Sequence, residues 1–238
     1  MSTAPRLSQR IDARNDKFTV TTKKRIMDQL PELDIESLEW LIKEHYQFSY
    51  ANVELLSLAR DCTAKLADKG VTVELQRNID EEDGHAPMYR QGMRNIGTDV
   101  DEREEFAPTT AFLTTVRELS APNPSRALGT LYATETAAIF EHETFFELCR
   151  EVCERRGHTY QGSLIKKFHD IHLDEGVEQG HKDGLAEFVD VTAAARAPGE
   201  GEQIDQHDLE QGAYAAIDAM QTWWDALLDR ALKPVPQR

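Results

Sequence analysis

The stretch ALGTLYATETAAIFEHETFFELCREVC, residues 127–153, decides the fold class, because its apolar residues recur at the spacing of a long amphipathic helix. Its apolar stripe consists of Leu128, Leu131, Ile139, Phe146, Cys149 and Cys153. Glu135 lies near the middle of that stripe, and His142 follows seven residues later. A carboxylate that faces a core is costly unless it is paired or bound to a metal ion. The stretch therefore predicts a core helix with a functional glutamate, and it leaves His142 open between a hydrogen-bonded core histidine and a ligand.

The rest of the chain shows the same helical periodicity, and no segment has the strict alternation of a strand. Proline and glycine separate the helical segments. The predicted helices span about residues 22–30, 34–68, 71–96, 109–119, 124–156, 160–194 (broken within) and 205–232. Residues 1–20 are polar and aperiodic, which predicts a flexible or loosely docked arm. Residues 21–238 are predicted to form a single all-α domain, a bundle whose core can hold helix-borne metal ligands.

The composition is that of a globular protein with an acidic surface, since 40% of the 238 residues are hydrophobic and 29% are charged. A formal net charge of −16 argues against nucleic acid and anionic membranes as partners, because both would be repelled. No apolar run reaches the roughly 18 residues of a membrane span, and the N-terminus has no apolar signal-peptide core. Three cysteines without a CxxC pair are typical of reduced core thiols. The expected location is the cytoplasm.

The densest group of metal-binding side chains is FHDIHLDEGVEQGH, residues 168–181. It contains His169, Asp170, His172, Asp174, Glu175, Glu178 and His181. Imidazole and carboxylate together are the ligands that proteins use for Zn, Mn and non-haem Fe. Side chains three residues apart share a helix face, so Glu178 and His181 can bind one ion. In a regular helix Asp174 shares that face, whereas His172 points almost opposite to His181.

Two earlier helical segments also carry inward-facing polar residues. Glu44 and His45 flank the apolar stripe of the first long helix. Glu82 and His85 fall on the apolar face of the next one, at the i, i+3 spacing of carboxylate-bridged sites, although a surface glutamate beside a core histidine would look the same. Together with Glu135 and the histidine-rich stretch, four segments offer carboxylates and histidines. This inventory fits a site for two Fe or Mn ions better than a cysteine-based zinc site.

Three segments in order resemble the haem-oxygenase-like non-haem diiron oxidases and oxygenases: NIDEEDGHAPMYRQGMRNIG (78–97), ALGTLYATETAAIF (127–140) and FHDIHLDEGVEQGH (168–181). The resemblance covers roughly residues 35–230 and implies a seven-helix, haem-oxygenase-like bundle that carries no haem. The family's Glu-x-x-His element falls on Glu82 and His85, and its isolated mid-helix glutamate falls on Glu135. Its first-helix glutamate best fits Glu44, by facing rather than by sequence context.

The last ligand helix departs from the family pattern. That pattern reads His-x-x-x-Asp-x-x-His; Glu178 and His181 fit its second half, but Asp174 occupies the first histidine slot. Gly176 would allow an unwound turn or a π-bulge that brings His172 to the site, so we favour His172 over Asp174. The predicted metal ligands are therefore Glu44, Glu82, His85, Glu135, His172, Glu178 and His181.

The resemblance implies an enzyme that binds two Fe(II) ions and uses O₂ as co-substrate to oxidise a small molecule. Family members act on amino acids or on fatty acids, by desaturation, C–C cleavage or N-oxygenation. We favour an amino-acid-like substrate in a specialised biosynthetic pathway, because the chain contains polar pocket candidates such as Tyr46, Asn52, Tyr89 and Arg90. An external electron donor and a homodimer stay open as partners, and Mn stays open in place of Fe.

Two other classes of function fit the same sequence. A metal-free enzyme of the related thiaminase-like bundle would use a nucleophilic cysteine, but Cys149 and Cys153 lie on an apolar face with no evident activating base except His142. A non-catalytic iron-binding protein would use the same ligands only to hold metal. Iron uptake measured together with O₂ consumption distinguishes the three classes.

Overall fold

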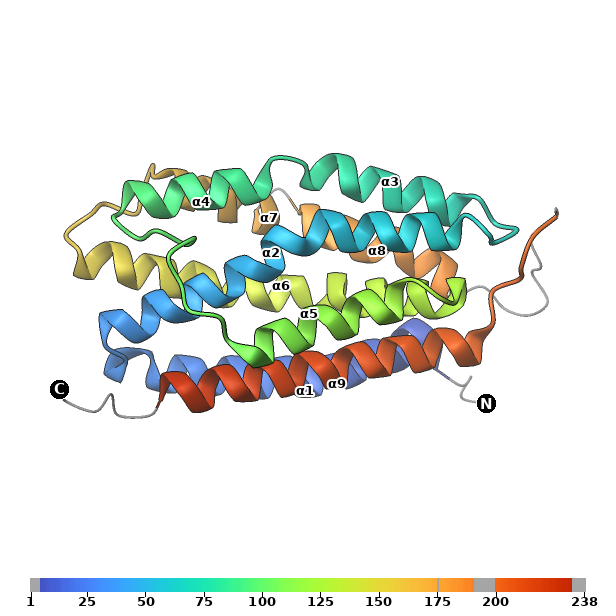
Figure 1. Ribbon diagram of the computed structural model, residues 1–238, viewed down its shortest axis with the longest axis horizontal. Helices are drawn as coiled ribbons and strands as arrows, with labels where there is room; N and C mark the ends of the chain where they lie inside the picture. Colours follow the sequence, from blue (N-terminus) through green and yellow to red (C-terminus); the bar gives the residue numbers. More distant parts are fainter. Residues whose placement is uncertain (1–4, 175, 191–199, 233–238) are drawn as a thin grey trace.

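The chain folds into long helices that lie side by side in an elongated bundle (Figure 1). The computed structural model describes residues 5–174, 176–190 and 200–232. The helices are α1 (Leu7–Gln29), followed by a short 3-10 turn η1 (Leu30–Glu32), α2 (Ile35–Thr63), α3 (Gly70–Glu82), α4 (His85–Asn95), α5 (Ala107–Ser120), α6 (Pro124–Arg155), α7 (Leu164–Leu173), α8 (Val177–Val189) and α9 (Gln206–Ala231). Within the described ranges the one strand-like feature is an isolated bridge between Leu66 and Glu202, so the predicted all-α class is confirmed.

Two long arms of the bundle are each interrupted by a left-handed glycine. α3 gives way to α4 at Gly84, whose φ is 94°, and α7 gives way to α8 at Gly176, whose φ is 75°. Glycine permits these turns because a Cβ disfavours positive φ. With each interrupted pair taken as one arm, the described helices form seven arms. The predicted break within 160–194 is confirmed, whereas the helix predicted over 71–96 is in fact two helices.

The N-terminal segment is a packed helix rather than the flexible arm predicted for residues 1–20. Residues 1–4 lie outside the described ranges, but α1 begins at Leu7 and packs against α6 and α9. Leu7 and Ile11 are buried on its inner face. Asn15 is buried on the same face and donates a hydrogen bond of 2.9 Å to a backbone carbonyl of α6. A polar residue at a buried position interrupts the periodic spacing of apolar residues, which explains why this helix was not predicted from the sequence.

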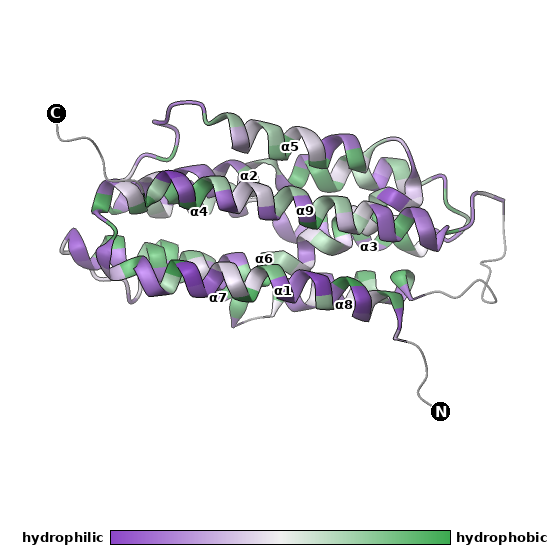
Figure 2. Ribbon diagram, turned by 90° about the horizontal axis from the view of Figure 1, so that it is seen from below, coloured by the Kyte–Doolittle hydropathy of each residue, from purple (hydrophilic) through white to green (hydrophobic). Residues whose placement is uncertain are grey.

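The helices are amphipathic, with hydrophobic and hydrophilic residues alternating along the ribbons (Figure 2). The hydrophobic residues form one core, in which Trp223 and Trp224 of α9 are 1% and 0% exposed. These two indoles are among the largest fully buried side chains, so α9 contributes strongly to the free energy of folding. None of the helices in the described ranges is both long enough and apolar enough to cross a membrane.

The central helix α6 contacts α1, α2, α5, α7, α8 and α9, and two glycines lie where it packs against α9. A Cβ at Gly129 would lie 2.0 Å from the carbonyl oxygen of Leu209, and one at Gly212 would lie 2.3 Å from that of Arg126. Both distances are far shorter than a van der Waals contact. The spacing between α6 and α9 therefore depends on glycine at these positions.

We expect Gly129→Ala to lower the free energy of unfolding by about 1–3 kcal/mol, because the added methyl group forces the α6 and α9 backbones apart. Gly180→Ala in α8 is the matched control, since a Cβ there meets no atom within 4 Å. It should raise the free energy of unfolding by about 0.5–1 kcal/mol, the usual gain of alanine over glycine within a helix. Urea unfolding followed by circular dichroism measures both changes, and a shift of the same sign in both variants would contradict this account.

Candidate metal centre

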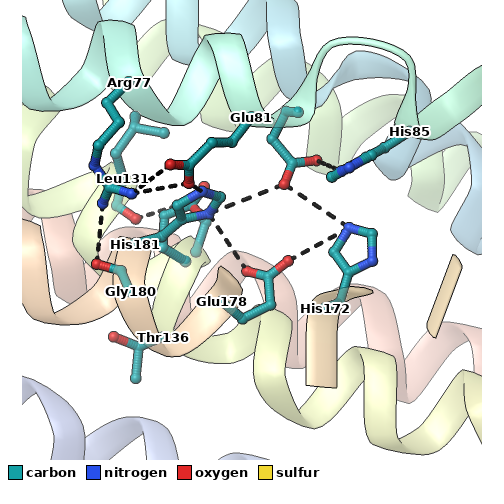
Figure 3. Close-up of polar contacts among 12 residues, drawn as sticks. Arg77, Glu81, His85, Leu131, Thr136, His172, Glu178, Gly180 and His181 are labelled. Atoms are coloured by element: carbon teal, nitrogen blue, oxygen red, sulfur yellow. Dashed lines mark hydrogen bonds and ion pairs between the residues drawn. The ribbon is translucent and has the colours of Figure 1, made fainter. Parts of the chain in front are cut away.

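A cluster of buried glutamates and histidines lies where the two interrupted arms meet (Figures 1 and 3). α3 packs against α8 and α4 packs against α7, so the two breaks lie at the same level of the bundle. Glu82 is the last residue of α3 and His85 is the first of α4. His172 lies in the last turn of α7, and Glu178 lies in the first turn of α8. The glycine turns therefore place four of the predicted ligands at helix ends that face one another.

Three overlapping groups of donor atoms make up the cluster, and within each group the atoms lie no more than 4.8 Å apart. The groups are Glu82–His85–His172, Glu82–Glu178–His181 and His142–His172–Glu178. Glu82 and Glu178 each belong to two groups. Nε2 of His172 lies 3.8 Å from an oxygen of Glu82 and also 3.8 Å from an oxygen of Glu178. The two carboxylates are thus shared between neighbouring sets of donors.

His181 connects the α6 glutamate to this cluster. Its Nδ1 lies 3.8 Å from Oε2 of Glu178 (Figure 3). It also lies 3.0 Å from Oε2 of Glu135 and 3.9 Å from Oε1 of Glu82. None of the six predicted ligands in the cluster is more than 9% exposed. The structure brings Glu82, His85, Glu135, His172, Glu178 and His181 close together.

The charges of these side chains balance one another within the core. Burial favours a neutral Glu82, but its contacts with His172 and His85 outweigh burial and hold its pKa well below the ordinary value. Burial likewise opposes ionisation of Glu178, yet bonds to histidines lower its pKa to about 2. Burial favours a neutral His181, but its contacts with Glu135 and Glu178 raise its pKa to about 11. Glu135 is the exception, because burial raises its pKa to about 7 despite His181.

The donor atoms fit metal ions better than they fit one another. Oε1 of Glu82, Oε2 of Glu178 and Nδ1 of His85 are buried, and none of them makes an aligned hydrogen bond. The histidine nitrogens that face the two glutamate oxygens lie 3.8 to 3.9 Å away, which is too long for a hydrogen bond. Unsatisfied buried groups are costly, and an ion between them would remove the cost. Imidazole and carboxylate donors without thiolate suit Fe or Mn.

Glu44 is the predicted ligand that the structure does not bring to the cluster. Its side chain is fully buried, as its helix facing indicated. Its oxygens, however, accept hydrogen bonds of 2.7 and 2.9 Å from Arg103 and one of 2.5 Å from the Thr109 hydroxyl. Arg103 lies in the connection between α4 and α5, far from Glu44 in the sequence. The inward carboxylate thus has a cationic partner that helix periodicity cannot reveal, and its position does not support a role as ligand.

The structure favours His172 over Asp174, as the sequence did. α7 ends at Leu173, and Gly176 then adopts a left-handed turn, so the segment is unwound rather than a regular helix. His172 is 2% exposed and joins two of the donor groups, whereas Asp174 is exposed and belongs to none. Glu175, which also belongs to the dense acidic stretch, lies outside the described residues.

Two further residues join the cluster, and they were not among the predicted ligands. Nε2 of His142 lies 3.2 Å from Oε1 of Glu178, and its ring stacks on His172 with 3.9 Å between centroids. Its place two helical turns after Glu135 is the sequence signal for this position. Glu81 lies 3.0 Å from Nε2 of His181. Periodicity places Glu81 at the edge of its helix, so no sequence signal points to that contact.

Comparison with known proteins places the chain among haem-oxygenase-like folds. A family described as a domain of unknown function with a solved structure, DUF3865, matches residues 3–230. A CADD-like protein of unknown function from Nostoc punctiforme is 22% identical, with a TM-score of 0.74 over 97% of each chain. A domain of unknown function with a haem oxygenase-like fold from Shewanella denitrificans is 17% identical, with a TM-score of 0.66 over 94% of this chain and 91% of that one. A TenA homologue from Pseudomonas syringae is 12% identical, with a TM-score of 0.62 over 91% of this chain and 92% of that one.

No curated protein matches the sequence. The similarity to solved structures confirms the predicted haem-oxygenase-like fold.

Proposed function

We propose, on the premise that this chain belongs to the DUF3865 family and has a haem-oxygenase-like fold, that its buried cluster binds two iron ions and uses O₂ to oxidise a small molecule. The observation that carries the proposal is the sharing of Glu82 and Glu178 between neighbouring donor groups. A carboxylate that belongs to two sets of donors can bridge two ions, as in other helical bundles with carboxylate-bridged sites. A carboxylate has two oxygens and can bind an ion on either side, whereas the ring nitrogen of His172, which also belongs to two groups, can bind only one.

In this proposal the converging side chains hold the ions together. The glutamates Glu82, Glu135 and Glu178 and the histidines of α4, α7 and α8 would be the ligands. The iron pair would supply the electrons that reduce O₂. The protein contributes the ligand positions and a buried site, since every one of these residues is at most 9% exposed. Exclusion of bulk water protects a reactive site from side reactions.

The surroundings of the cluster support a small polar substrate of the amino-acid type. The ring of Tyr89 stacks on Phe168 at 4.8 Å, and Phe168 lies 4.4 Å from the ring of His172. The Tyr89 hydroxyl is buried without a hydrogen-bond partner, a cost that a polar substrate would offset. The ring of Tyr46 lies 5.6 Å from that of Tyr89, and the Arg90 guanidinium lies 5.6 Å from the centre of the Tyr46 ring. Desaturation, C–C cleavage and N-oxygenation are the reactions that we propose for such a substrate.

The thiaminase-like alternative receives little support from the cysteines. All three cysteines are free and buried. Burial raises the pKa of Cys149 far above its ordinary value and that of Cys153 to about 11. The Cys149 thiol contacts the sulfur of Met93 at 3.8 Å. A nucleophilic cysteine needs a lowered pKa or a neighbouring base, and neither cysteine has one.

The proposal is tested by anaerobic titration with Fe(II), followed by measurement of O₂ consumption in the presence of the common amino acids. Ascorbate, added to half of the samples, serves as an external electron donor. We expect uptake of two ions per chain and O₂ consumption that at least one amino acid stimulates. Absence of iron uptake would favour a metal-free hydrolase. Uptake without substrate-stimulated O₂ consumption would favour an iron-binding protein without catalytic activity.

A further inference from the structure

The two ring nitrogens of His181 face different surroundings. Nδ1 points into the cluster, where the carboxylate oxygens of Glu135, Glu178 and Glu82 lie 3.0 to 3.9 Å away. Nε2 points the other way and lies 3.0 Å from Oε2 of Glu81 (Figure 3). A metal-bound imidazole binds through one nitrogen and keeps its proton on the other, and the acceptor of that proton sets the tautomer and the ring orientation.

Glu81 is itself held in place. Both of its oxygens accept hydrogen bonds of 2.8 Å from Nη1 of Arg77, one turn earlier in α3. Nη2 of the same guanidinium donates to the backbone carbonyl of Gly180 at 3.1 Å. Gly180 immediately precedes His181 in α8, so Arg77 ties the carboxylate of one helix to the backbone that carries the histidine on the other. Glu74 completes the set of Arg77 partners without touching His181.

We propose that Glu81, clamped by Arg77, is the positioning residue that keeps Nδ1 of His181 turned toward the metal ions. The proposal rests on the proposed function, because it assigns a role toward an iron site. Glu81 accepts the Nε2–H of His181 and so leaves Nδ1 of His181 free to bind a metal ion. Without Glu81, the proton of the His181 imidazole could sit on Nδ1 instead, and Nδ1 could then not bind a metal ion.

Glu81 also lies at the boundary between the site and solvent. Its side chain is 38% exposed, whereas that of His181 is 0% exposed. Together with Arg77 and Gln76 it lines an open surface cavity of about 600 Å³. Because of this exposure, replacement of Glu81 leaves no buried unpaired charge, and the variant should fold. An effect of the substitution on metal binding can therefore be separated from an effect on stability.

The test compares Glu81→Gln with Glu74→Gln, a control that removes a carboxylate from the same arginine but not from His181. Fe(II) affinity is measured anaerobically by competition with a chromogenic chelator. Loss of a carboxylate that orients a ligating histidine typically lowers metal affinity by about 10–100-fold. We expect a loss of this size in Glu81→Gln and an unchanged affinity in Glu74→Gln.

A second measurement reports the tautomer directly. Nitrogen-15 NMR of the histidine rings in the Zn(II)-loaded protein, with Zn(II) as a diamagnetic probe, should show the His181 proton on Nε2 in the wild type and a change of that signal in Glu81→Gln. Equal affinity of the wild type and Glu81→Gln, or an unchanged His181 signal, would overturn the role of Glu81. A wild-type protein that binds no Fe(II) would instead overturn the proposed function, so the two failures are distinguishable.

Discussion

Glu82→Gln is expected to lower the iron content from two ions per chain to one or none. Glu82 belongs to two of the three donor groups, and its oxygens lie 3.2 Å from Nδ1 of His85 and 3.8 Å from Nε2 of His172. An amide offers only one oxygen and no charge, so a bridging position cannot be filled. The measurement is anaerobic Fe(II) loading, removal of free metal on a desalting column, and analysis of bound iron per chain.

Glu44→Gln is the matched control for this experiment, because it also neutralises a buried glutamate of the bundle. Glu44 is 0% exposed and bonded to Arg103, and it belongs to none of the donor groups. Its substitution should leave two iron ions per chain. If Glu82→Gln retained both ions with wild-type affinity, Glu82 would not be a ligand and the proposal of a carboxylate-bridged pair would fail. Loss of iron in Glu44→Gln would return Glu44 to the ligand set.

Arg103→Met is expected to produce the largest loss of stability, about 3–5 kcal/mol in the free energy of unfolding. It leaves the fully buried Glu44 carboxylate with the Thr109 hydroxyl as its remaining hydrogen-bond donor. For a chain of this size each kcal/mol lowers the melting temperature by about 2–4 °C. Calorimetry or thermal circular dichroism of the metal-free protein measures the change.

The double variant Glu44→Gln/Arg103→Met separates the loss of an ion pair from the loss of side-chain packing. Removal of both charges should recover a large part of the stability, because the cost of Arg103→Met is mostly an uncompensated buried charge. Iron binding by Arg103→Met at a temperature where it is folded should match the wild type. A double variant no more stable than Arg103→Met would show that the guanidinium stabilises the bundle by packing instead.

Helix facing identified most of the candidate site, because a polar residue within an apolar stripe is conspicuous. Glu135 shows this clearly, since aliphatic residues surround it in α6. The same reasoning applied to Glu44 predicted burial correctly and its partner wrongly. Facing reports whether a side chain is buried, but the choice between a metal ion and an arginine depends on which distant segment packs opposite. That information lies in the tertiary structure, here in the connection that carries Arg103.

Local backbone geometry was predictable at one of the two breaks. Gly176 stood within a dense group of candidate ligands whose spacing was inconsistent with a regular helix, so an unwound turn was expected there. Glu82 and His85 satisfied the i, i+3 spacing of a helix, and nothing in that spacing indicated the left-handed turn at Gly84. The pair meets across the turn all the same, with 3.2 Å between Nδ1 of His85 and Oε2 of Glu82. A glutamate and a histidine three residues apart can therefore meet either within a regular helix or across a left-handed turn.

The two glycine turns, at Gly84 and Gly176, interrupt two arms of the bundle at one level, and the proposed ligands lie on both sides of these turns. On one side of the turns α4 packs against α7, and these two helices carry His85 and His172. On the other side α3 packs against α8. The continuous helix α6 packs against both α7 and α8. Two metal ions bound at the cluster would then connect α4 and α7 to α3 and α8. Iron loading should accordingly slow amide hydrogen exchange throughout α4 and α7, well beyond the few residues that hold the metal.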